Sequence, residues 1–295
     1  MPAHLRFTAY TLCLLAAHAG VLRALAEFSQ QDVTASHLIL VPFVSLALIY
    51  ANRTAIFSLV TTRPGVGVPI VLAGIGLSVV GQVAVAEGAR ALSVSVAGLV
   101  LSWIGGYVLF YGPAAARTAL FPLAFLAFMI PLPDVAISAA TEVLKTGSTE
   151  TVAHLFRLTG TPFYRQDYVF ALPTVTIEVA DECSGIRSTL ALLLTSLIAG
   201  HSQLKSPWGK VILVLAVLPV ALLKNAIRIV ALTLLAMYVD PSFLTGQLHH
   251  EGGVLFFLLA LALMAPLLLV LQRLETVRRL RGLPSANTAA GAVRD

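Results

Sequence analysis

The chain has 295 residues, of which 58% are hydrophobic and 11% are charged, and its mean hydropathy is +0.90. Soluble globular domains are about 45–50% apolar and about 25% charged, so this chain could not cover itself with a polar surface. Its formal charge of +5 does not indicate a nucleic-acid partner, because the basic residues are scattered or lie near the C-terminus. The composition excludes a soluble enzyme and predicts an integral protein of the lipid bilayer.

Long apolar runs predict the transmembrane helices, since about 20 apolar residues cross a bilayer. The run from Phe7 is expected to be a retained helix, because no small-residue cleavage site and soluble domain follow it. The longest run is expected to tilt or to break near Pro219. The eight predicted spans are 7–26, 36–51, 66–86, 91–111, 116–132, 185–201, 209–238 and 253–272.

These spans predict an all-α polytopic membrane protein with a single multi-pass domain over residues 1–272, followed by a basic, disordered tail over 273–295. With the N-terminus in the cytoplasm, eleven Lys and Arg residues fall in inside segments and five in outside segments. Cytoplasmic loops of membrane proteins carry this excess. We therefore expect a multi-pass protein of the plasma (inner) membrane with both termini in the cytoplasm.

The loop 133–184 is the one substantial polar insertion, and this orientation makes it extracytoplasmic. Its first part has helical spacing up to Gly160, which is typical of an amphipathic helix on a membrane surface. Its second part alternates at Val175, Ile177 and Val179 after Pro173, which predicts a short β-hairpin or strand pair. The chain then reaches Cys183.

Three polar clusters fall at or near the predicted outer ends of spans: 182–187 (ECSGIR), 224–228 (KNAIR) and 249–253 (HHEGG). Ionisable residues at such positions are costly and are functional candidates. Their convergence on one membrane face predicts a site.

The chemistry of the site follows from its residue types. A thiolate is the nucleophilic form of cysteine, and a helix N-terminus such as the one after Cys183 favours it. A histidine can act as general base, and a guanidinium such as that of Arg228 can stabilise an oxyanion or bind a carboxylate.

Simpler interpretations stay open for each cluster. A lone cysteine at a membrane boundary is usually inert, and Arg187 could pair only with Glu182. Lys224 and Arg228 could instead extend to the membrane interface. The pair His249 and His250 with Glu251 lacks a third His or Cys at ligand spacing, so no metal and no other cofactor is predicted.

The chain resembles the exosortase/archaeosortase family of membrane cysteine transpeptidases. The resemblance covers about 115–260 and is carried, in the family's order, by FPLAFLAFMIPLP (121–133), VADECSGIRST (179–189), LKNAIRIVALTLL (223–235) and LHHEGGVLFF (248–257). The first hundred residues resemble the family only in being hydrophobic.

The resemblance implies a catalytic Cys183, Arg228 and His249, with His250 as the alternative histidine. Ser184, Gly185, Arg187 and Asn225 stand in the same motifs as supporting residues. It also implies the partners: secreted proteins whose C-terminal sorting signal is a short motif, a transmembrane helix and a basic tail. The enzyme would cleave this signal outside the cell and transfer the protein to an acceptor, often in connection with exopolysaccharide.

Two other functions compete with this one. Polar residues within spans also line the permeation paths of transporters and channels. However, the charges lie toward one membrane face, and the sequence shows neither an inverted repeat nor a pair of broken helices at corresponding positions in two halves. A non-catalytic partner of exopolysaccharide synthesis would not need Cys183. A thiol reagent that cannot cross membranes separates the enzyme from both rivals, because only the enzyme should be inhibited.

Overall fold

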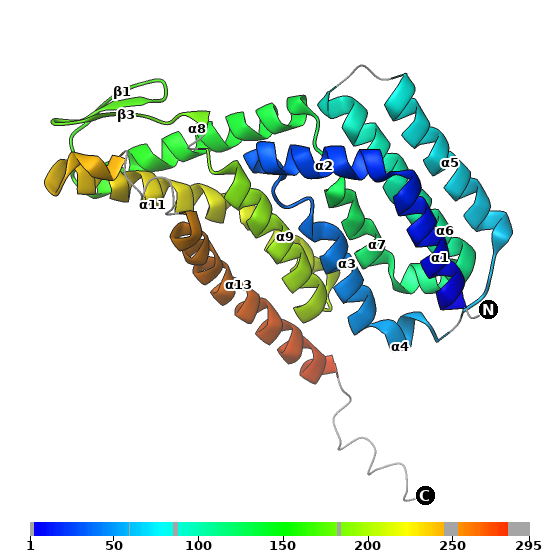
Figure 1. The fold of residues 1–295 in the computed structure, drawn as a ribbon. Coiled ribbons are helices and arrows are strands. Elements are labelled where there is room, and N and C mark those ends of the chain that lie inside the picture. Colours follow the sequence, from blue (N-terminus) through cyan, green and yellow to red (C-terminus); the bar gives the residue numbers. More distant parts are fainter. Residues whose placement is uncertain (1–2, 59, 85–87, 182–183, 245–252, 283–295) are drawn as a thin grey trace, which may run out of the picture. The chain divides into compact units, whose positions relative to one another are not determined.

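A computed structural model of the chain describes residues 3–58, 60–84, 88–181, 184–244 and 253–282 (Figure 1). Helices dominate these residues, with one small antiparallel sheet. The chain groups into two compact units, Met1–Ser138 and Ala139–Asp295. The residues of the predicted site that are described all belong to the second unit.

The first unit is built of helices alone among its described residues. They are α1 (Ala3–Ala17), α2 (Ala19–Gln31), η1 (Val33–Ala35), α3 (Leu40–Ala51), α4 (Arg53–Ile56), α5 (Pro64–Val83), α6 (Ala89–Thr118), α7 (Leu120–Phe125) and η2 (Leu126–Met129). Its core gathers aromatic and aliphatic side chains from α3, α4, α6 and α7, among them Ile49, Tyr107 and Leu123.

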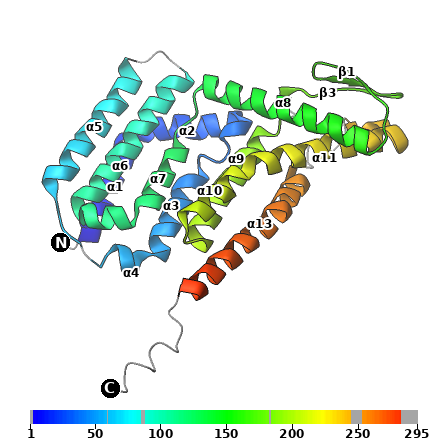
Figure 2. The ribbon, with the colours of Figure 1, turned by 180° about the vertical axis from the view of Figure 1, so that it is seen from behind.

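Helices α5 and α6 form the most extensive helix pair of the first unit, and they run side by side in Figure 2. Glycines make their contact. A Cβ added at Gly74 would lie 2.4 Å from the backbone nitrogen of Ser102, and one at Gly98 would lie 2.3 Å from that of Ser78. Small residues allow membrane helices to approach this closely. The two backbones come close because glycines, which have no side chain, stand at these positions of the interface.

The second unit combines helices with a sheet. Its elements are α8 (Asp134–Leu158, which begins five residues before the unit does), β1 (Tyr164–Gln166), β2 (Val169–Ala171), β3 (Thr176–Glu178), α9 (Ile186–Gln203), α10 (Pro207–Leu215), α11 (Val217–Tyr238), η4 (Pro241–Leu244) and α13 (Gly253–Gly282). The strands are antiparallel in the order β1-β2-β3, and Phe170 pairs with Ile177 in the β2–β3 register.

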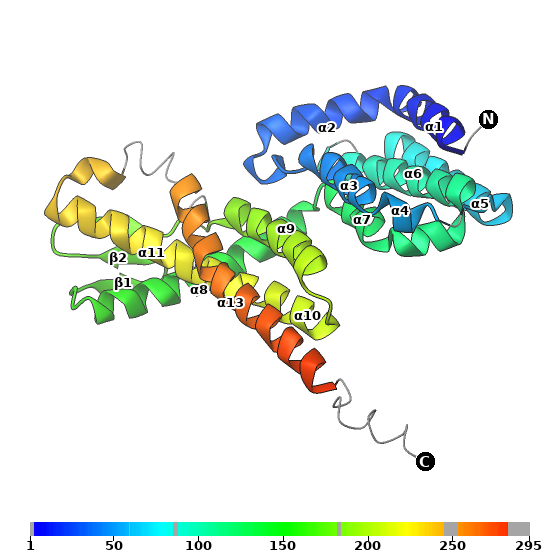
Figure 3. The ribbon, with the colours of Figure 1, turned by 90° about the horizontal axis from the view of Figure 1, so that it is seen from below.

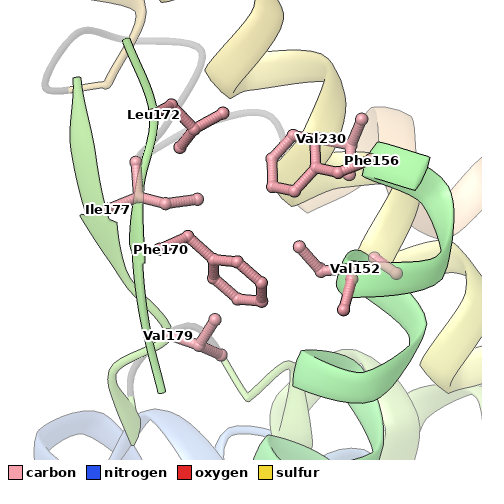
Figure 4. Packing of buried hydrophobic residues seen from close by; sticks show 9 residues of the cluster. Val152, Phe156, Phe170, Leu172, Ile177, Val179 and Val230 are labelled. Atoms are coloured by element: carbon pink, nitrogen blue, oxygen red, sulfur yellow. The ribbon is translucent and has the colours of Figure 1, made fainter. Parts of the chain in front are cut away.

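One face of the sheet packs on α8 and α11. Phe170, Leu172, Ile177 and Val179 from the sheet segment meet Val152, Ala153 and Phe156 of α8 and Ala226 and Val230 of α11 (Figure 4). Alternate strand residues point to the same face, so this segment buries every second side chain. The sheet is thereby anchored to the helix that carries Asn225 and Arg228.

A second core joins the helices α9, α10, α11 and α13. It contains Leu192, Leu204, Leu213, Val217, Ala260, Met264 and Leu271. Figure 3 shows α13 crossing alongside α9 and α11. This core joins α9 to the start of α11 through α10 and α13.

The predicted count of eight spans is not confirmed. Among the described residues, four segments are long and apolar enough to cross a membrane: α5, α6, the α10–α11 segment Pro207–Tyr238, and α13 up to Arg278. They match the predicted spans 66–86, 91–111, 209–238 and 253–272. Counting each bent helix pair as one span raises the number to six.

The other predicted spans differ for local reasons. The span 7–26 is divided into α1 and α2, which meet at a 70° bend at His18. The span 116–132 becomes α7 and η2, followed at a 93° bend by α8. Helix α3, with 12 residues, is short, and α9 is not among the helices apolar enough to span, although it has 18 residues. Apolarity alone does not reveal bends.

The structure also shows the predicted helix break, the predicted end of the loop helix and the predicted strands. The chain breaks at Ala216, between α10 and α11, because Pro219 cannot donate a hydrogen bond to Leu215. Helix α8 ends at Leu158, two residues before Gly160, whose φ is +67°. The predicted strand pair is a three-stranded sheet. The apolar face of α8 packs against this sheet rather than standing alone.

The C-terminal region differs from the predicted disordered tail. Helix α13 continues through Gly282, ten residues beyond the predicted end of the span at 272. Within this extension, the carboxylate of Glu275 accepts hydrogen bonds from the backbone N–H groups of Lys205 (3.0 Å) and Ser206 (2.9 Å). These N–H groups precede α10 and need an acceptor. The prediction for residues 283–295 lies outside the described residues.

Candidate active site

The N-terminus of α9 directly follows the predicted nucleophile in the sequence. Gly185 is the residue before the helix, and its φ of +76° lies in the left-handed region that glycine adopts without steric cost. A Cβ at Gly185 would lie 3.0 Å from Oδ1 of Asn225 and 3.3 Å from Nζ of Lys224. Glycine is therefore favoured by its conformation, and a larger residue here would also crowd the side chains of Lys224 and Asn225.

Lys224 of α11 is buried at this contact, with only 2% of its surface exposed. Its Nζ donates a hydrogen bond to Oγ of Ser188 at 2.6 Å. Ser188 in turn donates to the carbonyl oxygen of Gly185 at 2.9 Å. Lys224 thus lies buried against the first turn of α9.

Asn225, the next residue of α11, connects the site to α8. Its Nδ2 donates to Oγ of Ser148 at 3.0 Å, and both side chains are buried. One residue earlier on α8, a Cβ at Gly147 would lie 2.8 Å from the side chain of Leu222. The close approach of α8 to α11 at Gly147 brings the serine within reach of the amide.

The acidic residue Asp181 has a cationic partner. Lys145 of α8 lies 3.0 Å from the Asp181 carboxylate, and its ammonium also lies 4.4 Å from the ring centroid of Tyr168. Asp181 stands two residues before Cys183 in the sequence, and a nearby negative charge disfavours a thiolate. Because Lys145 pairs with this carboxylate, part of that opposing charge is offset.

A second ion pair holds the sheet on α8. Arg165 of β1 lies 2.8 Å from the carboxylate of Glu150. This hydrogen bond to Glu150 raises the pKa of Arg165 above its ordinary value. The pair is partly exposed and contributes little free energy, and it links β1 to α8 beside the apolar core.

Ser184 contributes a buried hydroxyl to the same turn. The residue is 1% exposed, and its Oγ has no hydrogen-bond partner among the described residues. Its backbone N–H donates to the carbonyl oxygen of Asp181 at 3.0 Å. A buried donor of this kind is costly unless something binds it.

The structure brings together some of the predicted site residues. Ser184 and Gly185 precede α9 and adjoin Asn225 of α11, while Arg228 lies one turn beyond Lys224 on α11 and is half-buried. Arg187 of α9 is exposed. The predicted catalytic residues Cys183, His249 and His250 lie outside the described residues, as do Glu182 and Glu251.

Other polar residues of this region were not assigned by the sequence. Lys145, Ser148 and Ser188 gave no signal, because serines and lysines on polar helices are common and their partners lie 36 to 77 positions away. Lys224 did give a signal, as a charge within an apolar run. No group of three or more His, Cys, Asp or Glu side chains in the described part of the chain is arranged to hold a metal ion.

A family model describing the transmembrane exosortases matches residues 29–266. The chain belongs to the transmembrane exosortase family. The match begins at residue 29, well before residue 115. It therefore includes helices of the first unit whose sequences resembled the family only in being hydrophobic. No match was found among the curated proteins or among the solved structures.

Membership of this family fits the membrane-spanning helices described above. Exosortases are in general membrane cysteine peptidases or transpeptidases. The polar contacts between the start of α9 and the middle of α11 lie within the matched residues, as do Cys183, Arg228, His249 and His250.

Proposed function

We propose that this exosortase is a cysteine transpeptidase that removes the C-terminal sorting signal of secreted proteins and transfers them to an acceptor. The observation that carries the proposal is the environment of the α9 N-terminus. There, the residues that follow Cys183 pack directly on Lys224 and Asn225 of α11. A helix N-terminus and nearby cations are the surroundings that favour a reactive thiolate.

The proposed reaction assigns one role to each catalytic residue. The Cys183 thiolate attacks the scissile carbonyl carbon, forming a carbon–sulfur bond, while Arg228 stabilises the oxyanion. The carbon–nitrogen bond then breaks, and His249, or His250 as the alternative, protonates the departing amine. The thioester is released when the acceptor's nucleophile, or water, attacks the same carbon and Cys183 leaves as thiolate.

The proposed location is the outer face of the inner membrane, with both termini in the cytoplasm. The excess of Lys and Arg in the segments assigned to the cytoplasm supports it. In this orientation the α8–sheet segment, which leads into Cys183, is outside and is accessible to secreted substrates. The partners are secreted proteins with a motif, a transmembrane helix and a basic tail.

The two cysteines of the chain provide a matched test. Cys183→Ala should abolish processing of a co-expressed secreted protein that carries such a C-terminal signal, with an unchanged amount of enzyme in the membrane. Cys13→Ala, at an exposed position of α1, should process the substrate fully. Pulse-chase labelling followed by gel electrophoresis measures both. Full processing by Cys183→Ala would refute the proposed function.

A further inference from the structure

The end of α9, the start of α10 and the C-terminal part of α13 meet at one end of the second unit (Figure 3). The side chain of Gln272 on α13 donates a hydrogen bond to that of Gln203 on α9 at 3.2 Å. One turn further along α13, the Glu275 carboxylate accepts the backbone N–H of Lys205 at 3.0 Å. A Cβ at Gly209 of α10 would lie 3.0 Å from Oε1 of the same carboxylate. These contacts hold the three segments together in one junction.

The junction carries three basic side chains. Lys205 lies just before α10, Lys210 lies near the start of α10, and Arg278 lies one turn beyond Glu275 on α13. Lys205 and Arg278 are exposed, and Lys210 is half-buried. No carboxylate lies within 4.0 Å of these three cations among the described residues. Glu275 is the only Asp or Glu in residues 199–216 and 263–282, and it already accepts backbone N–H groups. The junction is therefore a positively charged surface.

This surface coincides with the ends of two candidate membrane spans. One candidate span begins at Pro207, and another ends at Arg278. Trp208, at the start of the first of them, is 73% exposed. Tryptophan is enriched where membrane proteins pass through the lipid headgroups, because its ring is amphipathic. The three cations are thus placed at the level of the headgroups rather than within the hydrocarbon or far from it.

We propose that the junction binds the phosphate headgroup of an anionic phospholipid, with Lys205, Lys210 and Arg278 around the phosphate and Trp208 beside it. The charge selects the ligand, because a zwitterionic headgroup brings its own cation. Each Lys or Arg near an anionic bilayer surface strengthens the attraction by a factor of about five. In the proposed orientation the lipid belongs to the cytoplasmic leaflet. The lipid would join α10 to α13 at the membrane surface, and this role goes beyond the peptidase reaction.

The test is the quenching of Trp208 fluorescence by brominated lipids in vesicles that contain the purified full-length protein. The chain has two tryptophans, so a Trp103→Phe background leaves Trp208 as the only fluorophore. The vesicles contain rising fractions of brominated phosphatidylglycerol in phosphatidylcholine, or of brominated phosphatidylcholine in phosphatidylglycerol. The two series give the affinity for the anionic lipid relative to the zwitterionic lipid at Trp208. This ratio should be about five or more, and added salt should lower it.

Substitutions at the junction should remove the preference. Lys205→Gln and Arg278→Gln should each lower the ratio, and combining both with Lys210→Gln should bring it close to one. Lys205→Arg keeps the charge and should keep the ratio. Arg157→Gln is the matched control, because Arg157 is exposed at the end of α8 in the same unit and its loss changes the net charge equally. Its ratio should equal that of the Trp103→Phe background.

Four results overturn the proposal. They are a ratio of one in the Trp103→Phe background, an unchanged ratio in folded Lys205→Gln and Arg278→Gln, quenching by neither lipid, and a ratio lowered by inorganic phosphate more than by chloride at equal ionic strength. The third would place Trp208 outside the bilayer, and the fourth would assign the surface to a soluble phosphate. The measurement needs no substrate, so full processing by Cys183→Ala would refute the proposed function and leave this result unchanged.

Discussion

The α5–α6 pair of the first unit and the α9–α11 pair of the second unit both bring helix backbones close together, but by different means. In the first pair, Gly74 and Gly98 lie opposite backbone atoms. Buried serines of that unit bond to neutral groups: Ser45 donates to the carbonyl oxygen of Pro122, and Oγ of Ser78 accepts from the side-chain amide of Gln82. In the second pair, a glycine with positive φ faces a buried lysine and a buried asparagine.

The difference separates a structural contact from a chemical one. A glycine interface gains van der Waals contact and buries no charge, so it needs no ligand. The interface around Lys224 buries a charge, which carries a free-energy cost that only an anion or a polar network offsets. Substitutions in the α5–α6 pair should therefore change the free energy of unfolding. Substitutions in the α9–α11 pair should change the rate of the reaction.

The largest expected effects concern the histidines before α13. His249→Ala should lower the cleavage rate by about 10²–10⁴-fold, the usual contribution of a general acid or base, while His250→Ala keeps most of the activity. Consecutive helical residues point about 100° apart, so only one of the two can face the nucleophile if both are helical. Initial rates of substrate processing distinguish them. The reverse pattern would assign the role to His250, and two active variants would remove histidine from the mechanism.

The Arg228→Lys variant tests whether the α9–α11 pair takes part in the reaction. Arg228→Lys should lower the rate by about 10²–10³-fold, because a point charge does not replace the planar guanidinium at an oxyanion. The thermal stability should remain close to that of the native sequence, since the charge is retained. Rate and unfolding temperature should be measured on the same preparation. Near-native turnover of both Arg228→Lys and Arg228→Gln would make Arg228 a structural residue.

Two glycine substitutions on α5 test whether the α5–α6 contact stabilises the fold. Gly74→Ala places a Cβ 2.4 Å from the Ser102 backbone nitrogen, which no side-chain rotation can relieve, and should destabilise the protein by about 1–3 kcal/mol. Gly76→Ala, two residues away on the same helix, meets nothing within 4 Å and should be neutral or slightly stabilising. Thermal unfolding in detergent compares the two. If both variants were equally stable, α5 and α6 could move apart without loss of stability, and the close glycine contact would not be needed.

The Ser148–Asn225 hydrogen bond should have the smallest effect. A double-mutant cycle with Ser148→Ala and Asn225→Ala should give a coupling free energy of about 0.6 kcal/mol, the average for such bonds between membrane helices. Chemical unfolding in detergent yields the four free energies. Coupling near zero would indicate that α8 is held on α11 by the apolar core around Val152 and Phe156 alone.

Part of this architecture could be predicted from periodicity and motifs. The spans 66–86, 91–111, 209–238 and 253–272, the break near Pro219 and the helix ending before Gly160 all have local causes, namely apolar runs, proline and glycine. The count of eight spans was not confirmed. The composition of α9 already makes it too weakly apolar to count as a span, whereas the bend at His18 is not indicated by an apolar run. The tail was predicted to be disordered from residue 273, but α13 continues to Gly282. Within this extension the Glu275 carboxylate accepts a hydrogen bond from the backbone N–H of Ser206, just before α10.

For the site, the sequence by itself determined the family, the order of Cys183, Arg228 and the histidines, and the helix that begins after Gly185. These are properties of residue types and spacing along one chain. Only the tertiary structure decided that Lys224 bonds to Ser188, 36 positions away, and that Asn225 meets Ser148 from 77 positions away. The physical reason is that a helix sequence does not state which neighbour its polar face will meet. The packing of α8, α9 and α11 selects the partners, and burial then makes those hydrogen bonds obligatory.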